Sequence, residues 1–265
     1  MLYQICLTAA ALSVVMFGLW WVQTRTRDAS SVDAAWAFGI AGAAVIYGIT
    51  GDGDPTRRWI IAGLAAIWGL RLGGYLLFDR VFRATAEDGR YRAMRDHWGA
   101  KANLNFAWFY QSQAMAALLF SVPMLVGSHD PRPVGVVDGV AVAWWFLTLT
   151  MVSVADRQLA RWRAVPENRG RTCRGGLWRF SRHPNYFFEW LHWPAYVVLA
   201  WGGPGGPYTI AVPLLLLVLL LFVTGIPYVE ARALKTRGDD YRAYQRETSV
   251  FVPWFPKRVK AALSR

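Results

Sequence analysis

The residues most suited to chemistry lie in the sixteen-residue run Arg174–Glu189, which is followed directly by the apolar stretch 190–200. Its polar members are Arg174, Arg179, Arg182, His183, Asn185 and Glu189. Proline is favoured at the first position of a helix, so Pro184 predicts a helix start at this point. The free N–H groups and the positive end of a helix dipole favour a bound phosphate or carboxylate. The run therefore predicts an anion-binding site at the N-terminal end of an apolar helix.

Four arginines lie at or before the predicted helix start: Arg171, Arg174, Arg179 and Arg182. Any one of them could simply meet lipid headgroups at a membrane surface. Because all four gather beside one helix start, we favour a polyanionic ligand over headgroup contact.

Asn185 and Glu189 are four residues apart and so share one helix face. Glu189 is the only carboxylate of its apolar segment, and a buried carboxylate needs partners. The pair either binds an amide or ribose of a ligand or forms a structural contact with a nearby arginine.

A second set of polar residues is found in two apolar segments that precede this run in the sequence. Arg71 is inside the stretch 58–78, and Tyr75 follows one turn later on the same face. Asp33, at the start of the stretch 31–50, is a candidate partner for Arg71. Cations inside a membrane segment face a cavity or a counter-charge, so the alternatives are a polar pocket and a structural Asp33–Arg71 pair.

Further charged residues flank the apolar segments on what is predicted to be the same side. They are the turn Glu87–Tyr91 with Arg90, the pair Asp156 and Arg163, and Glu230 with Tyr241. The sequence has no His or Cys pair at metal-ligand spacing, no Walker-type loop and no Gly-x-Gly-x-x-Gly after a strand. Any nucleotide must therefore be bound by loops and helix mouths, and no metal is expected.

The elements that position these residues are apolar segments near 2–22, 31–50, 58–78, 107–126, 136–155, 185–201 and 207–226. A membrane-spanning helix needs about 20 apolar residues. The chain of 265 residues is 55% hydrophobic and only 17% charged, which is typical of a membrane protein. We expect a single all-α integral membrane domain over 1–265, with about seven transmembrane helices and short helices near 88–98 and 239–246.

The basic residues predict an orientation. Twenty-five of the 29 Lys and Arg residues fall in 23–30, 79–106, 156–184 and 227–265. The positive-inside rule makes these four regions cytoplasmic, with the N-terminus outside and the tail 227–265 inside. The net charge of +12 then reflects loops that face anionic lipids, not a nucleic-acid partner. Cys6 and Cys173 fall on opposite sides, so no disulfide is expected.

The run Gly175–Glu189 resembles the C-terminal signature of steroid 5-alpha-reductase-like membrane proteins, and most closely the bacterial group of domain of unknown function 1295. Trp68–Arg71, Glu87–Tyr91, Asp156–Gln158 and the ending from Tyr241 to Trp254 also fit that group. The resemblance covers most of the chain. It implies a seven-helix fold in the bacterial inner membrane, with a cytoplasmic pocket for NADPH that gives hydride to a carbon–carbon double bond of a lipophilic enone.

The resemblance also implies site residues. The positions that match the family's dinucleotide contacts are Asp156, Arg163, Arg171, Asn185, Glu189 and Arg90. The full predicted cofactor-binding set adds Arg179, Arg182, His183, Tyr186, Glu230 and Tyr241. The catalytic set is Tyr75 with Asp33 and Arg71, which would polarise a ketone of a steroid-like substrate. Asp33 is the only carboxylate of the second segment, where the steroid reductases carry a Gln-Glu pair.

Two other functions stay open. Isoprenylcysteine carboxyl methyltransferases have a similar Arg-His-Pro-x-Tyr motif, which makes S-adenosylmethionine the alternative cofactor. A lipid-binding or scaffold protein is the non-enzymatic alternative, for which Asn185→Ala and Glu189→Ala would leave function intact. The expected partners are membrane lipids and a lipophilic small molecule; the sequence leaves the oligomeric state open.

Overall fold

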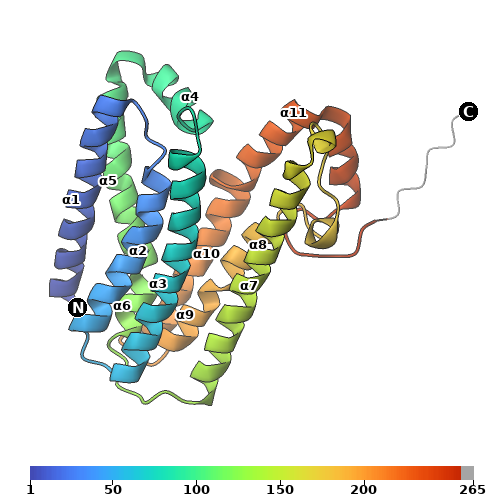
Figure 1. The fold of residues 1–265 in the computed structure, drawn as a ribbon. Coiled ribbons are helices and arrows are strands. Elements are labelled where there is room, and N and C mark those ends of the chain that lie inside the picture. The colour runs from blue at the N-terminus through green and yellow to red at the C-terminus, as the bar shows by residue number, and fades with distance from the viewer. Residues whose placement is uncertain (258–265) are drawn as a thin grey trace, which may run out of the picture. The chain divides into compact units, whose positions relative to one another are not determined.

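A computed structural model describes residues 1–257, in which the chain is helical and forms no β-strand (Figure 1). The chain divides into two compact units. The first comprises Met1–Val136 with Tyr196–Val212, and the second comprises Val137–Ala195 with the described residues from Pro213 on. Neither unit is one continuous stretch of sequence, which agrees with the lack of a linker in the chain.

The first unit is a helical bundle centred on α2. Its main helices are α1 (Leu2–Thr26), α2 (Val32–Thr50), α3 (Pro55–Leu77), α4 (Gly89–Trp98), α5 (Ala102–Phe120) and α6 (Val122–Gly127). Helix α2 packs against α1, α3 and α5 (Figure 1). A Cβ atom at Gly69 of α3 would lie 2.5 Å from the Cβ of Ala41, so the closest approach of α2 and α3 requires glycine there.

The second unit is built on α7 (Val136–Ala164), α8 (Pro184–Leu191) and α11 (Ile226–Glu247). Two further helices, α9 (Trp193–Ala200) and α10 (Ala211–Val218), carry the chain from one unit into the other. Buried Trp178 donates from Nε1 to the carbonyl of Ala155 at 3.0 Å. Buried Tyr244 donates to the carbonyls of Trp178 and of Ser181, the latter at 3.1 Å. These bonds hold the loop before α8 against both long helices.

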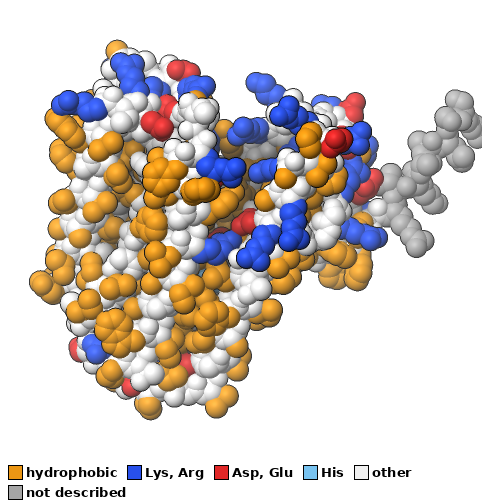
Figure 2. All heavy atoms as spheres, in the orientation of Figure 1, with side chains coloured by type: hydrophobic (Ala, Val, Ile, Leu, Met, Phe, Trp, Pro, Cys, Tyr) orange, Lys and Arg blue, Asp and Glu red, His pale blue; other side chains and the backbone are white. Residues whose placement is uncertain are grey.

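Six helical stretches among the described residues are long and apolar enough to cross a membrane. They are Leu2–Thr26, Val32–Thr50, Pro55–Phe82, Gly89–Gly127, Val136–Ala164 and Gly206–Glu247. The chain is therefore a multi-pass, all-α membrane protein, as the sequence predicts. Hydrophobic side chains cover the flanks of the long helices, while Lys and Arg gather around α4 in the first unit and around α11 in the second (Figure 2).

The stretch 185–201, predicted as the sixth of about seven spans, is not one continuous helix. It forms α8 and α9, two helices of eight residues separated at His192. The cause is Pro194, which has no N–H for the carbonyl of Trp190 and whose ring clashes with that carbonyl. Which side of the membrane holds the N-terminus stays a prediction.

Other helix boundaries differ for local reasons. Helix α3 begins at Pro55, three residues earlier than expected, because the Asp54 side chain caps it by accepting from the N–H of Arg57 at 2.9 Å. Helix α7 continues nine residues past the predicted end at 155. The predicted short helix near 88–98 is confirmed as α4. The one near 239–246 is the end of α11, set off by a kink at Gly238, whose φ is 52°.

Candidate functional site

Helix α8 begins at Pro184, as predicted, and His183 immediately precedes it. The His183 side chain is 2% exposed, and neither ring nitrogen has a hydrogen-bond partner among the described residues. Its Nε2 lies 3.7 Å from Oε1 of Glu230. Burial lowers the pKa of His183 to about 4, against the opposing effect of the Glu230 carboxylate and with a contribution from the Arg182 charge. The ring is therefore neutral near pH 7, with two polar atoms left unsatisfied.

Arg182, Glu230 and Tyr241, three predicted cofactor-binding residues, lie together. Arg182 donates from Nε to Glu230 at 2.6 Å, and Tyr241 donates to the same carboxylate oxygen at 3.2 Å. Arg182 also donates from Nη1 to the carbonyls of Gln245 and Thr248, at 3.0 and 2.8 Å. Arg182 thus anchors the loop before α8 to α11, and its charge is compensated inside the protein.

Asn185 joins α8 to α7 by donating from Nδ2 to Oδ1 of Asp156 at 3.1 Å. Its own Oδ1 accepts the N–H of Tyr186 at 3.0 Å. The Tyr186 ring lies edge-on to His183, with ring centroids 5.7 Å apart. Glu189 lies one turn further along α8 and is partly buried. We call Asp156, Arg182, His183, Asn185 and Glu230 the α8 site.

The four arginines predicted to bind a polyanion differ in their surroundings. Arg174 donates to Asp240 at 2.9 Å and to Glu247 at 3.4 Å, so it resembles Arg182 in being used internally. Arg171 and Arg179 are exposed and form no ion pair with the described residues. Arg163, at the end of α7, is exposed in the same way. Of the arginines predicted to bind the cofactor in this unit, Arg163, Arg171 and Arg179 are therefore the exposed ones.

In the first unit, Asp33 is the centre of a charged network. Its Oδ1 accepts from the Tyr91 hydroxyl at 2.6 Å. Its Oδ2 accepts from Arg90 at 2.5 Å and from Arg80. Arg90 also donates from Nε to Asp88 at 3.1 Å. Burial raises the pKa of Asp88, but the hydrogen bonds from Arg90 outweigh it and hold the pKa below its usual range. We call Asp33, Arg80, Asp88, Arg90 and Tyr91 the Asp33 network.

The alternative of an Asp33–Arg71 pair is wrong, because the partners of Asp33 are Arg80, Arg90 and Tyr91. Arg71 and Tyr75 share a face of α3, and Tyr75 is 54% exposed. The structure thus brings the predicted cofactor residue Arg90 to Asp33, while Arg71 is not among the groups around that carboxylate. The catalytic roles of Tyr75, Asp33 and Arg71 stay predictions.

Sequence reasoning missed Arg80 as a partner of Asp33, and it missed a second cluster formed by Gln23, Glu87 and Arg95. Buried Gln23 accepts from Arg95 at 3.1 Å, and Arg95 also donates to Glu87 at 2.8 Å. The charged turn 87–91 signals an ionic cluster, but it does not name the partners. Arg80 gives no signal at all, because it lies in a π-helical turn over Phe78–Phe82, where the ordinary helical spacing does not hold.

Comparison with known proteins places the chain in a family. A family model described as Protein of unknown function (DUF1295) matches residues 19–248. The chain belongs to this family. The match includes both the Asp33 network and the α8 site, so the family's sequence pattern spans the two units.

A relative among curated proteins is an uncharacterized protein of Schizosaccharomyces pombe. It is 27% identical over an alignment of 206 residues, and the match covers 66% of this chain and 58% of the relative. The chain thus matches less than two thirds of the relative's length. No solved structure matches the chain.

Proposed function

We propose that this membrane protein is an NADPH-dependent reductase of a carbon–carbon double bond in a lipophilic enone. The observation that carries the proposal is the α8 site. It has a buried neutral histidine directly before a helix N-terminus, and neither ring nitrogen has a hydrogen-bond partner within residues 1–257. Buried polar atoms without partners are rare in proteins and point to a ligand that would satisfy them.

The residues present fit a dinucleotide. Exposed Arg163, Arg171 and Arg179 offer donors to phosphate oxygens, and the positive end of the α8 dipole favours an anion. Asn185, fixed by its bond to Asp156, and Glu189 would bind the carboxamide end. Bound NADPH would supply a hydride to the substrate.

The protein's part in such a reaction is to bind and polarise the enone. A hydroxyl that donates to the carbonyl oxygen stabilises the negative charge that develops there. We assign this role to Tyr75 and a supporting role to Arg71, as the sequence predicts. The Asp33 network, in our proposal, holds the segment 78–98 in place and takes no proton.

S-adenosylmethionine is the alternative cofactor, and one feature favours it. The sequence Arg182-His183-Pro184 followed by Tyr186 is shared with the isoprenylcysteine methyltransferase pattern, so a methyl donor is compared directly in the experiment below. In either case the proposed location is the bacterial inner membrane, with α8 opening to the cytoplasm.

The test is thermal unfolding of the purified protein in detergent with NADPH, NADH or S-adenosylmethionine. A ligand at 100 times its dissociation constant adds about 2.7 kcal/mol of stability. We expect stabilisation by NADPH, its loss in Asn185→Ala, and its retention in Asn103→Ala, an exposed asparagine of α5. Oxidation of NADPH by reconstituted protein with enone lipids then tests the reaction. Stabilisation by S-adenosylmethionine alone, or by none of the three, would overturn the proposal.

A further inference from the structure

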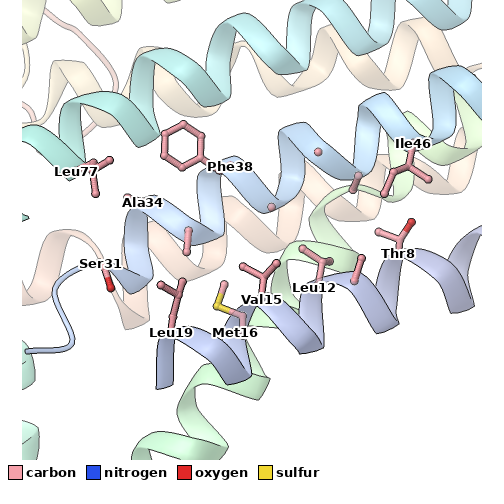
Figure 3. Close-up of a pocket in the computed structure, with 15 residues that line it drawn as sticks. Thr8, Leu12, Val15, Met16, Leu19, Ser31, Ala34, Phe38, Ile46 and Leu77 are labelled. Carbon is pink, nitrogen blue, oxygen red and sulfur yellow. The ribbon is translucent and has the colours of Figure 1, made fainter. Parts of the chain in front are cut away.

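An apolar groove lies between α1 and α2, with a volume of about 400 Å³ (Figure 3). Side chains of α1 line one side of the groove. The other side is lined by α2, mostly through alanines and glycines but also through Phe38 and Ile46, and Leu77 of α3 lies at one end. Its only hydroxyl-bearing residues are Thr8 and Ser31, which Figure 3 shows at opposite ends. At 1.5 Å per residue, the α1 side from Thr8 to Leu19 is about 16 Å long. The groove therefore suits a long ligand that is apolar along its length.

The space between α1 and α2 differs at two glycines that line the groove, Gly39 and Gly42. At Gly39 the two helices are close, since an added Cβ would lie 2.8 Å from Leu12. At Gly42, about one turn further, an added Cβ would meet no heavy atom within 4 Å, and this residue is exposed. Both α1 and α2 are apolar and long enough to span a membrane. An opening on the side of such helices faces lipid chains.

Cationic side chains lie beyond the end of the groove marked by Leu19 and Ser31. Arg25 is in the last turn of α1, six residues or about 9 Å past Leu19, and Arg27 ends the helix. Both are exposed, and neither forms an ion pair with a described residue. The Arg25 guanidinium lies 4.8 Å from the ring centroid of Trp21. Tryptophan followed by arginine at a helix end is typical of the boundary between lipid chains and headgroups.

We propose that the groove binds one acyl chain of an anionic phospholipid, with the lipid phosphate at Arg25 and Arg27. The apolar lining fits the chain, and Arg25 and Arg27, which are exposed and form no ion pair with the described residues, complement the phosphate. This is a lipid site separate from the proposed reductase chemistry, because neither Tyr75 nor Arg71 lines the groove. A chain seated in the groove would fill the space between α1 and α2 and stabilise their packing through dispersion contacts.

The experiment is native mass spectrometry of the full-length protein in detergent, titrated with phosphatidylglycerol or with phosphatidylcholine of the same chains. Gly42→Leu and Ala11→Leu each place a side chain in the groove, from α2 and from α1. Gly18→Leu is the matched control, because Gly18 is exposed on α1, also has open space around it and does not line the groove. Circular dichroism and thermal unfolding check that each variant is folded.

We expect one phosphatidylglycerol to be retained per protein, with affinity lowered about tenfold or more in Gly42→Leu and Ala11→Leu as dispersion contacts are lost. Gly18→Leu should bind like the wild type. Arg25→Gln with Arg27→Gln should remove the preference for phosphatidylglycerol, about tenfold, without abolishing binding of either lipid. Equal loss in Gly18→Leu, unchanged binding in both groove variants, or no headgroup preference in the wild type would overturn the proposal.

Discussion

The Asp33 network and the α8 site are both rich in charge, yet they differ in how far their polar groups are satisfied. In the Asp33 network, the central carboxylate accepts from two arginines and a tyrosine. In the α8 site, Arg182 and Glu230 satisfy each other, but the two buried ring nitrogens of His183 have no partner in the described part of the chain. The difference separates polar groups that stabilise the fold from polar groups that could bind a ligand. A buried ion pair alone is therefore weak support for a binding site.

The largest loss of stability is expected from breaking the ion pair between Arg182 and Glu230 in the α8 site. Glu230→Gln leaves Arg182, which is 11% exposed, without its counter-charge. Removing one partner of a buried pair costs about 3 kcal/mol. Thermal unfolding in detergent should show this loss, while Glu167→Gln, at an exposed glutamate without an ion pair among the described residues, should not. Equal stability of the two variants would mean that the pair does not anchor the loop.

A somewhat smaller loss is expected in the Asp33 network. Asp33→Asn leaves Arg80 and Arg90 to share the Asp88 carboxylate, and because the Asp33 side chain is 23% exposed, solvent screens part of the penalty. We expect a loss of about 2 kcal/mol, measured by thermal unfolding. Asp79→Asn, at an exposed aspartate, is the control. The Asp33→Asn variant should still bind NADPH. Loss of binding would contradict the distinction between the Asp33 network and the α8 site.

Buried, neutral His183 in the α8 site predicts that the stability of the fold decreases at acidic pH. The folded pKa of His183, about 4, lies below the unfolded value of about 6.5, so the unfolded state binds the proton first. Stability contributed by the neutral ring is complete above pH 6.5 and is lost as pH falls toward 4. By pH 5 the loss is about 1 to 2 kcal/mol. Stability measured against pH should fall less steeply in His183→Gln than in the wild type, and parallel curves would contradict the assignment.

The smallest effect concerns one exposed cation. Arg171→Gln should weaken NADPH binding about fivefold, because it removes a charge-assisted contact from a solvent-exposed position. Ligand titration by thermal shift measures the change, and exposed Arg169→Gln is the matched control. The wild-type affinity should also fall with added salt more than that of Arg171→Gln. Identical behaviour of the two variants would remove Arg171 from the proposed set.

Local rules predicted the local features of the fold. Pro184 marks the start of α8, and the charge pattern marks the turn before α4. Partners that are distant in sequence could not be predicted, because no spacing rule links Arg182 to Glu230, 48 residues away, or Asp33 to Arg90, 57 residues away. Pro194 could have predicted the break at His192. The segment 185–201 was instead predicted as one span because it is apolar along its length. Whether a charge is satisfied is a property of tertiary structure, and this decides which predicted residues are available to a ligand.

The π-helical turns over Phe78–Phe82 and Leu219–Val223 have a consequence for register. A turn of this kind acts as one extra residue in a helix that otherwise advances 100° per residue. A helical-wheel projection carried from α3 into Phe78–Phe82 therefore assigns these five side chains to the wrong faces. Both turns also stand at the end of a helix, since the chain bends directly after Phe82 and directly after Val223.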